Sequence, residues 1–250
     1  MIELTSQDGH SFPAYRADPA ETPKGAVVVL QDYLGISDHI RKQADDFAAK
    51  GYVAIAPSLF QRAQKAEAAS AAEGAEIAKS VPIEAALLDV QAAVDSVKGS
   101  GKVALVGYSW GGYVAYVSAN RLQDVACAIG YYAAGLTEEH SEKRKIPTLL
   151  HFPEEDPSTP LEGMMQFRAT RPDVSAFSYP KVKDGFNFTT AENFDAEAAE
   201  RASERTFFWI SQFVEGQPPV TLKNAGAYAQ AKTDKKKKKK EDDDMGPPME

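Results

Sequence analysis

The chain has 250 residues, which is enough for one domain with a single large core, and its hydrophobic fraction of 43% and charged fraction of 26% are ordinary for a globular protein. The formal net charge is −8. Residues 223–250 hold eight lysines against six acidic residues, so residues 1–222 carry −10. A body this acidic argues against nucleic-acid binding by phosphate neutralisation.

Other classes of protein are excluded by local features. The start at Met1 lacks the basic and apolar regions of a signal peptide, and no run of about 18 apolar residues occurs that could span a membrane. The single cysteine, Cys127, excludes an intramolecular disulfide and gives no sign of a zinc site. We therefore expect a cytoplasmic protein without metal or cofactor, acting as a monomer or a small homo-oligomer.

In chain order, the first half predicts strands that alternate with helices. Segments at about 2–5 and 11–15, joined by Asp8-Gly9, are typical of an antiparallel hairpin. Apolar β-branched runs predict buried strands, and apolar residues three and four apart predict amphipathic helices. These expected elements are a strand at 27–30, a helix at 38–50, a strand at 52–57, an exposed helix or lid within 63–80, and a helix at 82–97.

The second half continues the alternation. Its expected elements are strands at 103–106, 125–131, 148–152 and 174–179, and helices at 110–122, 160–170 and 191–214. Repeated βα units predict an α/β protein with a mainly parallel sheet of about eight strands and helices on both faces.

The C-terminal segment differs from the body in composition. The lysine run Lys235–Lys240 is followed directly by the acidic run 241–244. Blocks of like charge cannot bury apolar surface, so we predict that residues 223–250 form a disordered, solvated tail outside a domain of residues 1–222.

One motif carries chemistry. Gly107-Tyr108-Ser109-Trp110-Gly111 matches G-x-S-x-G directly after a predicted buried strand and before a predicted helix, which is the context of a nucleophile elbow. Small residues two positions before and after Ser109 relieve crowding in the tight turn, and the following helix directs its positive N-terminus at the site. The alternative is a glycine-rich turn whose serine only caps the helix.

Around this motif the sequence resembles the dienelactone hydrolase family over nearly all of residues 1–215. The segments that carry the resemblance are 6–12, 31–35, 89–93, 101–108, 129–132 and 204–206. The resemblance implies an α/β-hydrolase fold. It also implies an oxyanion hole made by the backbone N–H groups of Trp110 and Tyr33, and it puts Asp32 where the family has a carboxylate that contacts the resting nucleophile.

The triad acid and base are assigned through the same resemblance. The acid is expected after the strand at 148–152, where we choose Asp156, with Glu154 and Glu155 as alternatives. The base departs from the family, because Asp184 stands where members carry histidine and no histidine follows His151. We interpret all four histidines as structural, namely His10, His39, His140 and His151.

The loss of histidine leaves two functional hypotheses. A serine hydroxyl is a weak nucleophile until a base takes its proton, although neighbouring carboxylates that share one proton can supply a base of raised pKa. The first hypothesis is therefore a serine hydrolase of small esters or lactones, slow or even inactive. The alternative is a degenerate hydrolase that binds a ligand or a protein without turnover.

The substrate side also departs from the family. Serine replaces the usual cysteine nucleophile, which favours ester chemistry, and Phe188 stands where the family has an arginine for the substrate carboxylate. We expect Tyr33, Trp110, Phe186 and Phe188 to wall an aromatic pocket, with core packing as the alternative role for each.

Overall fold

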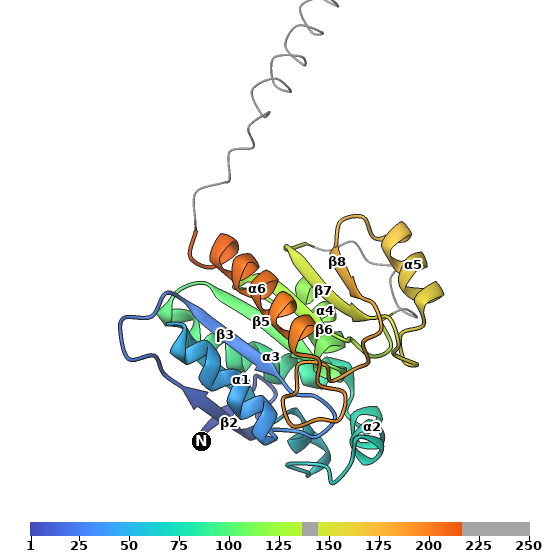
Figure 1. Ribbon diagram of the computed structural model, residues 1–250. Helices are drawn as coiled ribbons and strands as arrows, with labels where there is room; N and C mark the ends of the chain where they lie inside the picture. Colours follow the sequence, from blue (N-terminus) through green and yellow to red (C-terminus); the bar gives the residue numbers. More distant parts are fainter. Residues whose placement is uncertain (137–144, 217–250) are drawn as a thin grey trace, which may run out of the picture. The chain divides into compact units, whose positions relative to one another are not determined.

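The computed structural model describes residues 1–136 and 145–216, and within them a single eight-stranded sheet forms the centre of the molecule (Figure 1). The spatial order is β1-β2-β4-β3-β5-β6-β7-β8. β1, β2 and β4 pair antiparallel, and all other neighbours pair parallel. The strands are β1 (Ile2–Thr5), β2 (Ser11–Ala17), β3 (Ala26–Leu30), β4 (Val53–Pro57), β5 (Val103–Tyr108), β6 (Val125–Tyr131), β7 (Thr148–Pro153) and β8 (Ser175–Tyr179).

Helices cover both faces of this sheet (Figure 1). The α-helices are α1 (Asp38–Ala49), α2 (Ala71–Ser80), α3 (Ile83–Val97), α4 (Trp110–Arg121), α5 (Leu161–Thr170) and α6 (Ala196–Phe213), and two short 3₁₀ helices are η1 (Leu59–Ala63) and η2 (Lys98–Ser100). One apolar cluster joins α1 and α6 to the sheet, and a second joins α2, α3 and α4 to the opposite face. β3, β4 and β5 are buried along their whole length because both of their faces are covered.

The strand order indicates at which edge of the sheet a site is expected. β3 lies between β4 and β5, so the chain leaves β3 towards one side of the sheet and later returns to add β5 on the other side. Ligands of open α/β sheets bind where the carboxyl ends of the strands meet such a reversal. The loop after β3 and the turn after β5 therefore define the place at which a site is expected.

The α/β-hydrolase fold predicted from the sequence is confirmed, and two elements differ in detail. The segment 63–80 is not a uniformly exposed helix, since α2 begins only at Ala71 and buries Gly74, Ile77 and Ala78. The last helix begins at Ala196 rather than near residue 191, because Asp195 caps it by accepting a hydrogen bond from the Ala198 N–H.

Two predictions concern the membrane and the tail. Among the residues that the structure describes, no helix is long and apolar enough to cross a bilayer. The predicted tail at 223–250 lies outside the described residues.

Candidate active site

Ser109 occupies a strained turn between β5 and α4. Its backbone adopts φ 52° and ψ −118°, a conformation that side chains other than glycine rarely take. The strain is held by backbone hydrogen bonds, in which the Ser109 N–H donates to the Tyr131 carbonyl at 3.0 Å and the Ser109 carbonyl accepts from Gly112 at 2.9 Å. The side chain does not cap α4. The geometry is that of the predicted elbow, not of a serine cap.

Glycines make this turn possible, as expected from their spacing. A Cβ on Gly107 would lie 2.0 Å from the Gly111 carbonyl oxygen. A Cβ on Gly111 would lie 2.3 Å from the carbonyl oxygen of Gln31, in the loop after β3. The first turn of α4 can therefore pack directly on that loop, and the Gly111 N–H donates to the Gln31 carbonyl at 3.0 Å.

The loop after β3 is held from outside by α2. A Cβ on Gly74 of α2 would lie only 1.6 Å from the Tyr33 carbonyl oxygen, so the helix touches the loop backbone. The Ala68 N–H also donates to the Leu34 carbonyl at 3.2 Å. Sequence reasoning missed Gly74, although a lone glycine inside a predicted helix is a signal of close packing.

Two backbone donors remain unused near Ser109. The N–H groups of Trp110 and Tyr33, which the resemblance assigns to an oxyanion hole, form no hydrogen bond with any described residue. The Trp110 N–H also stands at the N-terminus of α4, where the helix dipole favours negative charge.

The three predicted carboxylates follow three different strands. Asp32 follows β3 and is 8% exposed, and its Oδ1 accepts from the Leu34 N–H at 2.7 Å. Asp156 follows β7, is also buried, and accepts hydrogen bonds from the backbone and hydroxyl groups of Ser158. Asp184 follows β8 and lies exposed at the rim. All three thus belong to the carboxyl edge of the parallel strands.

Electrostatics link these groups to one another and to aromatic side chains. Burial raises the pKa of Asp32 to about 6, against the lowering effect of the Leu34 N–H. Partial loss of hydration raises the pKa of Asp184, and the negative charge of Asp156 adds a smaller increase. Burial raises the pKa of Tyr33, and the charges of both Asp156 and Asp184 add to that increase. The loops after β7 and β8 are also joined directly, since the Glu155 N–H donates to the Val182 carbonyl at 2.9 Å.

The structure does not join these groups in a hydrogen-bonded triad. The Ser109 hydroxyl forms no hydrogen bond with a described residue, and so none with Asp32. His39 is buried against Tyr108 and stacks on Phe188 with ring centroids 4.4 Å apart. Burial, with a smaller effect of Lys42, lowers the pKa of His39 to about 4.

His151 belongs to a polar network in the core, in agreement with its structural interpretation. Its Nδ1 lies 2.8 Å from the Tyr179 hydroxyl, and its Nε2 lies 3.1 Å from the Thr206 hydroxyl. Arg205 donates a hydrogen bond to the Tyr179 hydroxyl oxygen. With the Tyr179 proton donated to Nδ1 of His151, the imidazole carries its own proton on Nε2 and donates it to Thr206. Burial, aided by the charge of Arg205, lowers the pKa of His151 to about 3. His10 lies beside Phe12 in the N-terminal hairpin, and His140 lies outside the described residues.

The predicted aromatic pocket is only partly supported. Phe186 is fully buried and packs against Tyr131, Tyr132 and Tyr179, which favours the core-packing alternative for this residue. The Trp110 side chain is buried against Phe60. Tyr33 and Phe188 are half-buried, which keeps them as candidates for the wall.

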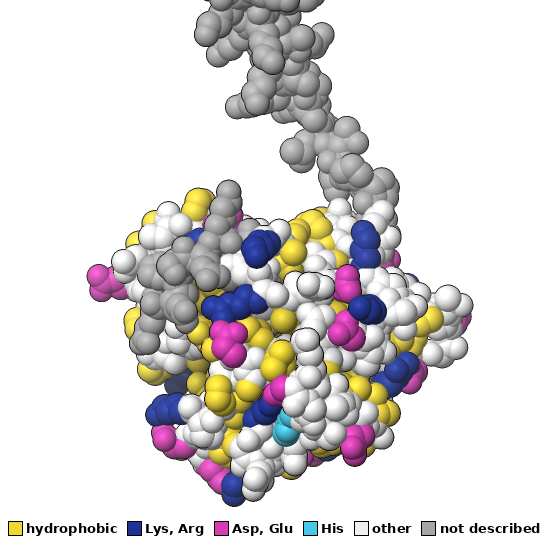
Figure 2. Space-filling view, turned by 180° about the vertical axis from the view of Figure 1, so that it is seen from behind, with side chains coloured by type: hydrophobic (Ala, Val, Ile, Leu, Met, Phe, Trp, Pro, Cys, Tyr) yellow, Lys and Arg dark blue, Asp and Glu magenta, His cyan; other side chains and the backbone are white. Residues whose placement is uncertain are grey.

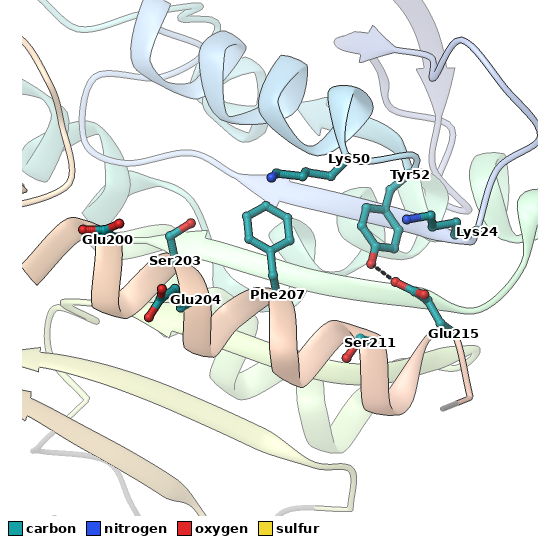
Figure 3. Close-up of a pocket in the computed structure, with 9 residues that line it drawn as sticks. All are labelled: Lys24, Lys50, Tyr52, Glu200, Ser203, Glu204, Phe207, Ser211 and Glu215. Carbon is teal, nitrogen blue, oxygen red and sulfur yellow. Dashed lines mark hydrogen bonds between the residues drawn. The ribbon is translucent and has the colours of Figure 1, made fainter. Parts of the chain in front are cut away.

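Surface hollows elsewhere do not contain the predicted site residues. A hollow of about 450 Å³ lies between α6 and the residues Lys24, Lys50 and Tyr52 (Figure 3). It borders the starts of β3 and β4, at the opposite edge of the sheet from Ser109. A second hollow of about 310 Å³ reaches Tyr108 and Tyr131 from the side of α1 and α6.

The face of the molecule in Figure 2 shows no large basic patch among the described side chains. Acidic and basic side chains are interspersed over the face in Figure 2. Among residues 1–136 and 145–216, no group of three or more His, Cys, Asp or Glu side chains is arranged to hold a metal ion.

Comparisons with known proteins agree with this geometry. Residues 12–214 match the model of the dienelactone hydrolase family. Carboxymethylenebutenolidase from Pseudomonas putida is 26% identical over 232 residues, covering 87% of this chain and 98% of the relative. Carboxymethylenebutenolidase 1 from Cupriavidus pinatubonensis is 29% identical over 221 residues, covering 82% and 93%.

A solved structure agrees at the level of the fold. The crystal structure of a putative dienelactone hydrolase from Klebsiella pneumoniae superposes with a TM-score of 0.73 at 23% identity, covering 85% of this chain and 99% of the other. Together with the family match across most of the chain and the elbow at Ser109, this likeness fixes the assignment. The protein belongs to the dienelactone hydrolase family of the α/β-hydrolase superfamily.

Proposed function

We propose that the protein hydrolyses small esters or lactones, with Ser109 as the nucleophile. The observation that carries the proposal is the strained backbone of Ser109, at φ 52°, between a buried strand and a helix N-terminus. Strain of this kind persists when the surrounding structure enforces it, and it clusters at active sites. Membership of a hydrolase family supports the same reaction class.

In the proposed reaction, the Ser109 oxygen forms a bond to the substrate carbonyl carbon while its proton moves to a carboxylate. The negative charge that develops on the carbonyl oxygen is stabilised by the N–H groups of Trp110 and Tyr33, which have no other described acceptor. Collapse of the tetrahedral intermediate breaks the bond to the alcohol, which leaves with a proton. Water then hydrolyses the acyl-enzyme.

The proton acceptor in this proposal is Asp184, which takes the place of the family's histidine, with Asp156 as its neighbour. Support comes from the raised pKa of Asp184, because a carboxylate with a higher pKa accepts a proton more readily than an ordinary aspartate does. Asp32, whose pKa is about 6, is a second acceptor in the same region. A carboxylate delivers a proton to the leaving group less readily than imidazole does, so we expect slow turnover.

A second candidate function is binding without turnover. It is favoured by the isolation of Ser109, whose hydroxyl makes no hydrogen bond to a described carboxylate or histidine. In that case the same site holds a ligand that the protein does not cleave.

Labelling with a fluorophosphonate tests the nucleophile without requiring turnover. We expect one equivalent of adduct in the intact protein, mapped to Ser109 by peptide mass spectrometry and absent from Ser109→Ala. Ser118→Ala, which removes the hydroxyl of a fully buried serine in α4, is the matched control and should label normally. An adduct absent from the parent protein, or located on another residue, would overturn the assignment of Ser109.

A further inference from the structure

The carboxylates of the candidate site have no cationic partners. Asp32, Asp156 and Asp184 form no ion pair with any lysine, arginine or histidine in the described part of the chain. Buried carboxylates such as Asp32 and Asp156 are normally paired, because an isolated charge loses its hydration without compensation, and the exposed Asp184 adds a third unpaired charge. The site therefore has uncompensated negative charge.

Two buried polar groups near this charge also lack partners. Asp32 uses one carboxylate oxygen for the Leu34 N–H, and its other oxygen accepts no hydrogen bond from a described residue. The Ser109 hydroxyl is equally unpartnered, and both residues are less than a tenth exposed. Asp32 and Ser109 follow neighbouring strands, and the Gly111-to-Gln31 hydrogen bond holds their two segments together. The Ser109 hydroxyl and the free Asp32 oxygen are not among the fully buried polar atoms, so a ligand at this site can reach both.

The described basic side chains around the site form no ion pair with its carboxylates, and this holds for the exposed Lys183, which precedes Asp184 in the chain. Lys79 of α2 acts electrostatically on Tyr33, but its ammonium group is exposed and forms an ion pair with Glu76 at 2.6 Å. Asp156 and Asp184 act on the same tyrosine without such a partner. Arg41 and Arg62 are paired elsewhere, with Glu67 and with Asp8 and Asp89.

We propose that this site selects esters that carry a positively charged ammonium group and rejects esters that carry a carboxylate. The proposal rests on the hydrolase function proposed above and names its substrate class. The ammonium group lies against the exposed Asp184, whose loop is joined to that of the buried Asp156 by the hydrogen bond from the Glu155 N–H to the Val182 carbonyl at 2.9 Å. The half-buried Tyr33 ring, on which the charges of both carboxylates act, offers a cation–π surface.

The same charge acts on the reaction itself. Attack on the carbonyl group creates an oxyanion, which nearby carboxylates destabilise and a substrate cation stabilises. Two unit charges about 6 Å apart, at an effective dielectric constant of about 40, change a rate or an affinity roughly ten-fold. Salt screens charges at the rim, so the selectivity should weaken as ionic strength rises.

Three 4-nitrophenyl esters of similar acyl length test the selectivity: the valerate, the 4-(trimethylammonio)butyrate and the glutarate monoester. Each kcat/KM is divided by the rate of that ester with hydroxide, at 10 mM and 200 mM NaCl. We expect the cationic ester to exceed the anionic ester by at least ten-fold at low salt, with a smaller ratio at high salt. In the Ser109→Ala background, where calorimetric titration measures binding without turnover, Asp184→Asn should lower the ratio of the affinities for the cationic and anionic esters several-fold. Glu3→Gln, which removes the same charge from the exposed edge strand β1, should leave that ratio unchanged.

Calorimetric titration of Ser109→Ala with the two charged esters separates this inference from the hydrolase proposal. Preferential binding of the cationic ester without turnover by the parent protein would support the charge selectivity and reject the hydrolase function. Turnover with equal use of all three esters, or preference for the glutarate, would overturn the selectivity and keep the hydrolase. If neither charged ester binds and none is hydrolysed, both proposals are wrong.

Discussion

At the scale of single residues, Asp32 is the most perturbed carboxyl group of the site. It lies almost fully buried, and one N–H donor only partly offsets the loss of hydration. Its pKa of about 6, compared with an ordinary value of 3.8, means that the folded protein binds this proton more tightly than the unfolded chain does. Ionised Asp32 therefore destabilises the fold.

The sign of this linkage gives a first prediction. Protonated Asp32 contributes to stability below pH 4, and this contribution is lost as the pH rises through 6. A pKa shift of about two units corresponds to a loss of up to about 3 kcal/mol in the free energy of unfolding. Asp32→Asn keeps an acceptor for the Leu34 N–H and removes the charge. It should therefore raise the free energy of unfolding at pH 8 and leave it nearly unchanged at pH 4.

Urea unfolding at both pH values measures this effect. Asp38→Asn, which changes an acidic residue at the start of α1, controls for the loss of a charge in the same region. If Asp32→Asn lowered the free energy of unfolding at pH 8, the ionised carboxylate would have to be stabilised by its surroundings, and the prediction would be wrong.

At the scale of secondary-structure elements, α2 packs closely against the loop after β3, which carries Tyr33. The helix lacks a side chain at Gly74, where its backbone meets the Tyr33 carbonyl. Because Tyr33 is one of the proposed oxyanion donors, a shift of α2 moves the donor as well. The packing of α2 therefore affects the position of the proposed Tyr33 donor.

Gly74→Ala is predicted to destabilise the protein by about 1–3 kcal/mol, since the new Cβ would lie 1.6 Å from a backbone oxygen. Gly99→Ala in η2 is the matched control, because nothing lies within 4 Å of its Cβ. Denaturant unfolding of both variants measures the difference. Equal stability of the two variants would contradict the close approach.

Most elements could be predicted from the sequence because their signals are local. The β-branched runs of β3 and β6 and the periodicity of α3 specify strands and a helix directly. The start of α6 was placed too early, because residues 191–195 resemble helix formers while the Asp195 cap determines the boundary. For Phe186 the sequence leaves a pocket wall and core packing both open, because its position in the chain does not reveal the tyrosines that surround it.

The site was predictable only in part. Ser109 and the strands before Asp32, Asp156 and Asp184 follow from motif and topology. The isolation of the Ser109 hydroxyl and the hydrogen bond from Leu34 to Asp32 depend on loop conformations that no spacing specifies. The close approach at Gly74 is likewise a tertiary contact between distant segments.

At the scale of the whole molecule, Arg62 joins three segments that are far apart in the sequence. From η1 it forms two hydrogen bonds to Asp89 of α3, at 2.6 and 2.8 Å, and it also pairs with Asp8 in the N-terminal hairpin. The Asp89 side chain is completely buried. Removal of Arg62 would leave that carboxylate without its partner.

Arg62→Leu is predicted to lower the free energy of unfolding by about 3–5 kcal/mol, the usual effect of breaking a buried pair. Arg16→Leu breaks the exposed Arg16–Asp18 pair and should change it by less than about 1 kcal/mol. Adding Asp89→Asn to Arg62→Leu should recover part of the loss. A similar small effect for both arginines in thermal or urea unfolding would show that the Asp89 charge is tolerated alone.

The central claim is that Ser109 acts in a site where carboxylates replace the missing histidine. Hydrolysis of 4-nitrophenyl acetate by the parent protein, Ser109→Ala and Asp184→His tests it most directly. We predict slow turnover by the parent protein and none above background for Ser109→Ala. An inert parent protein, together with a Ser109-dependent rate gained by Asp184→His, would contradict the claim and favour a binding role for an intact scaffold that lacks its base.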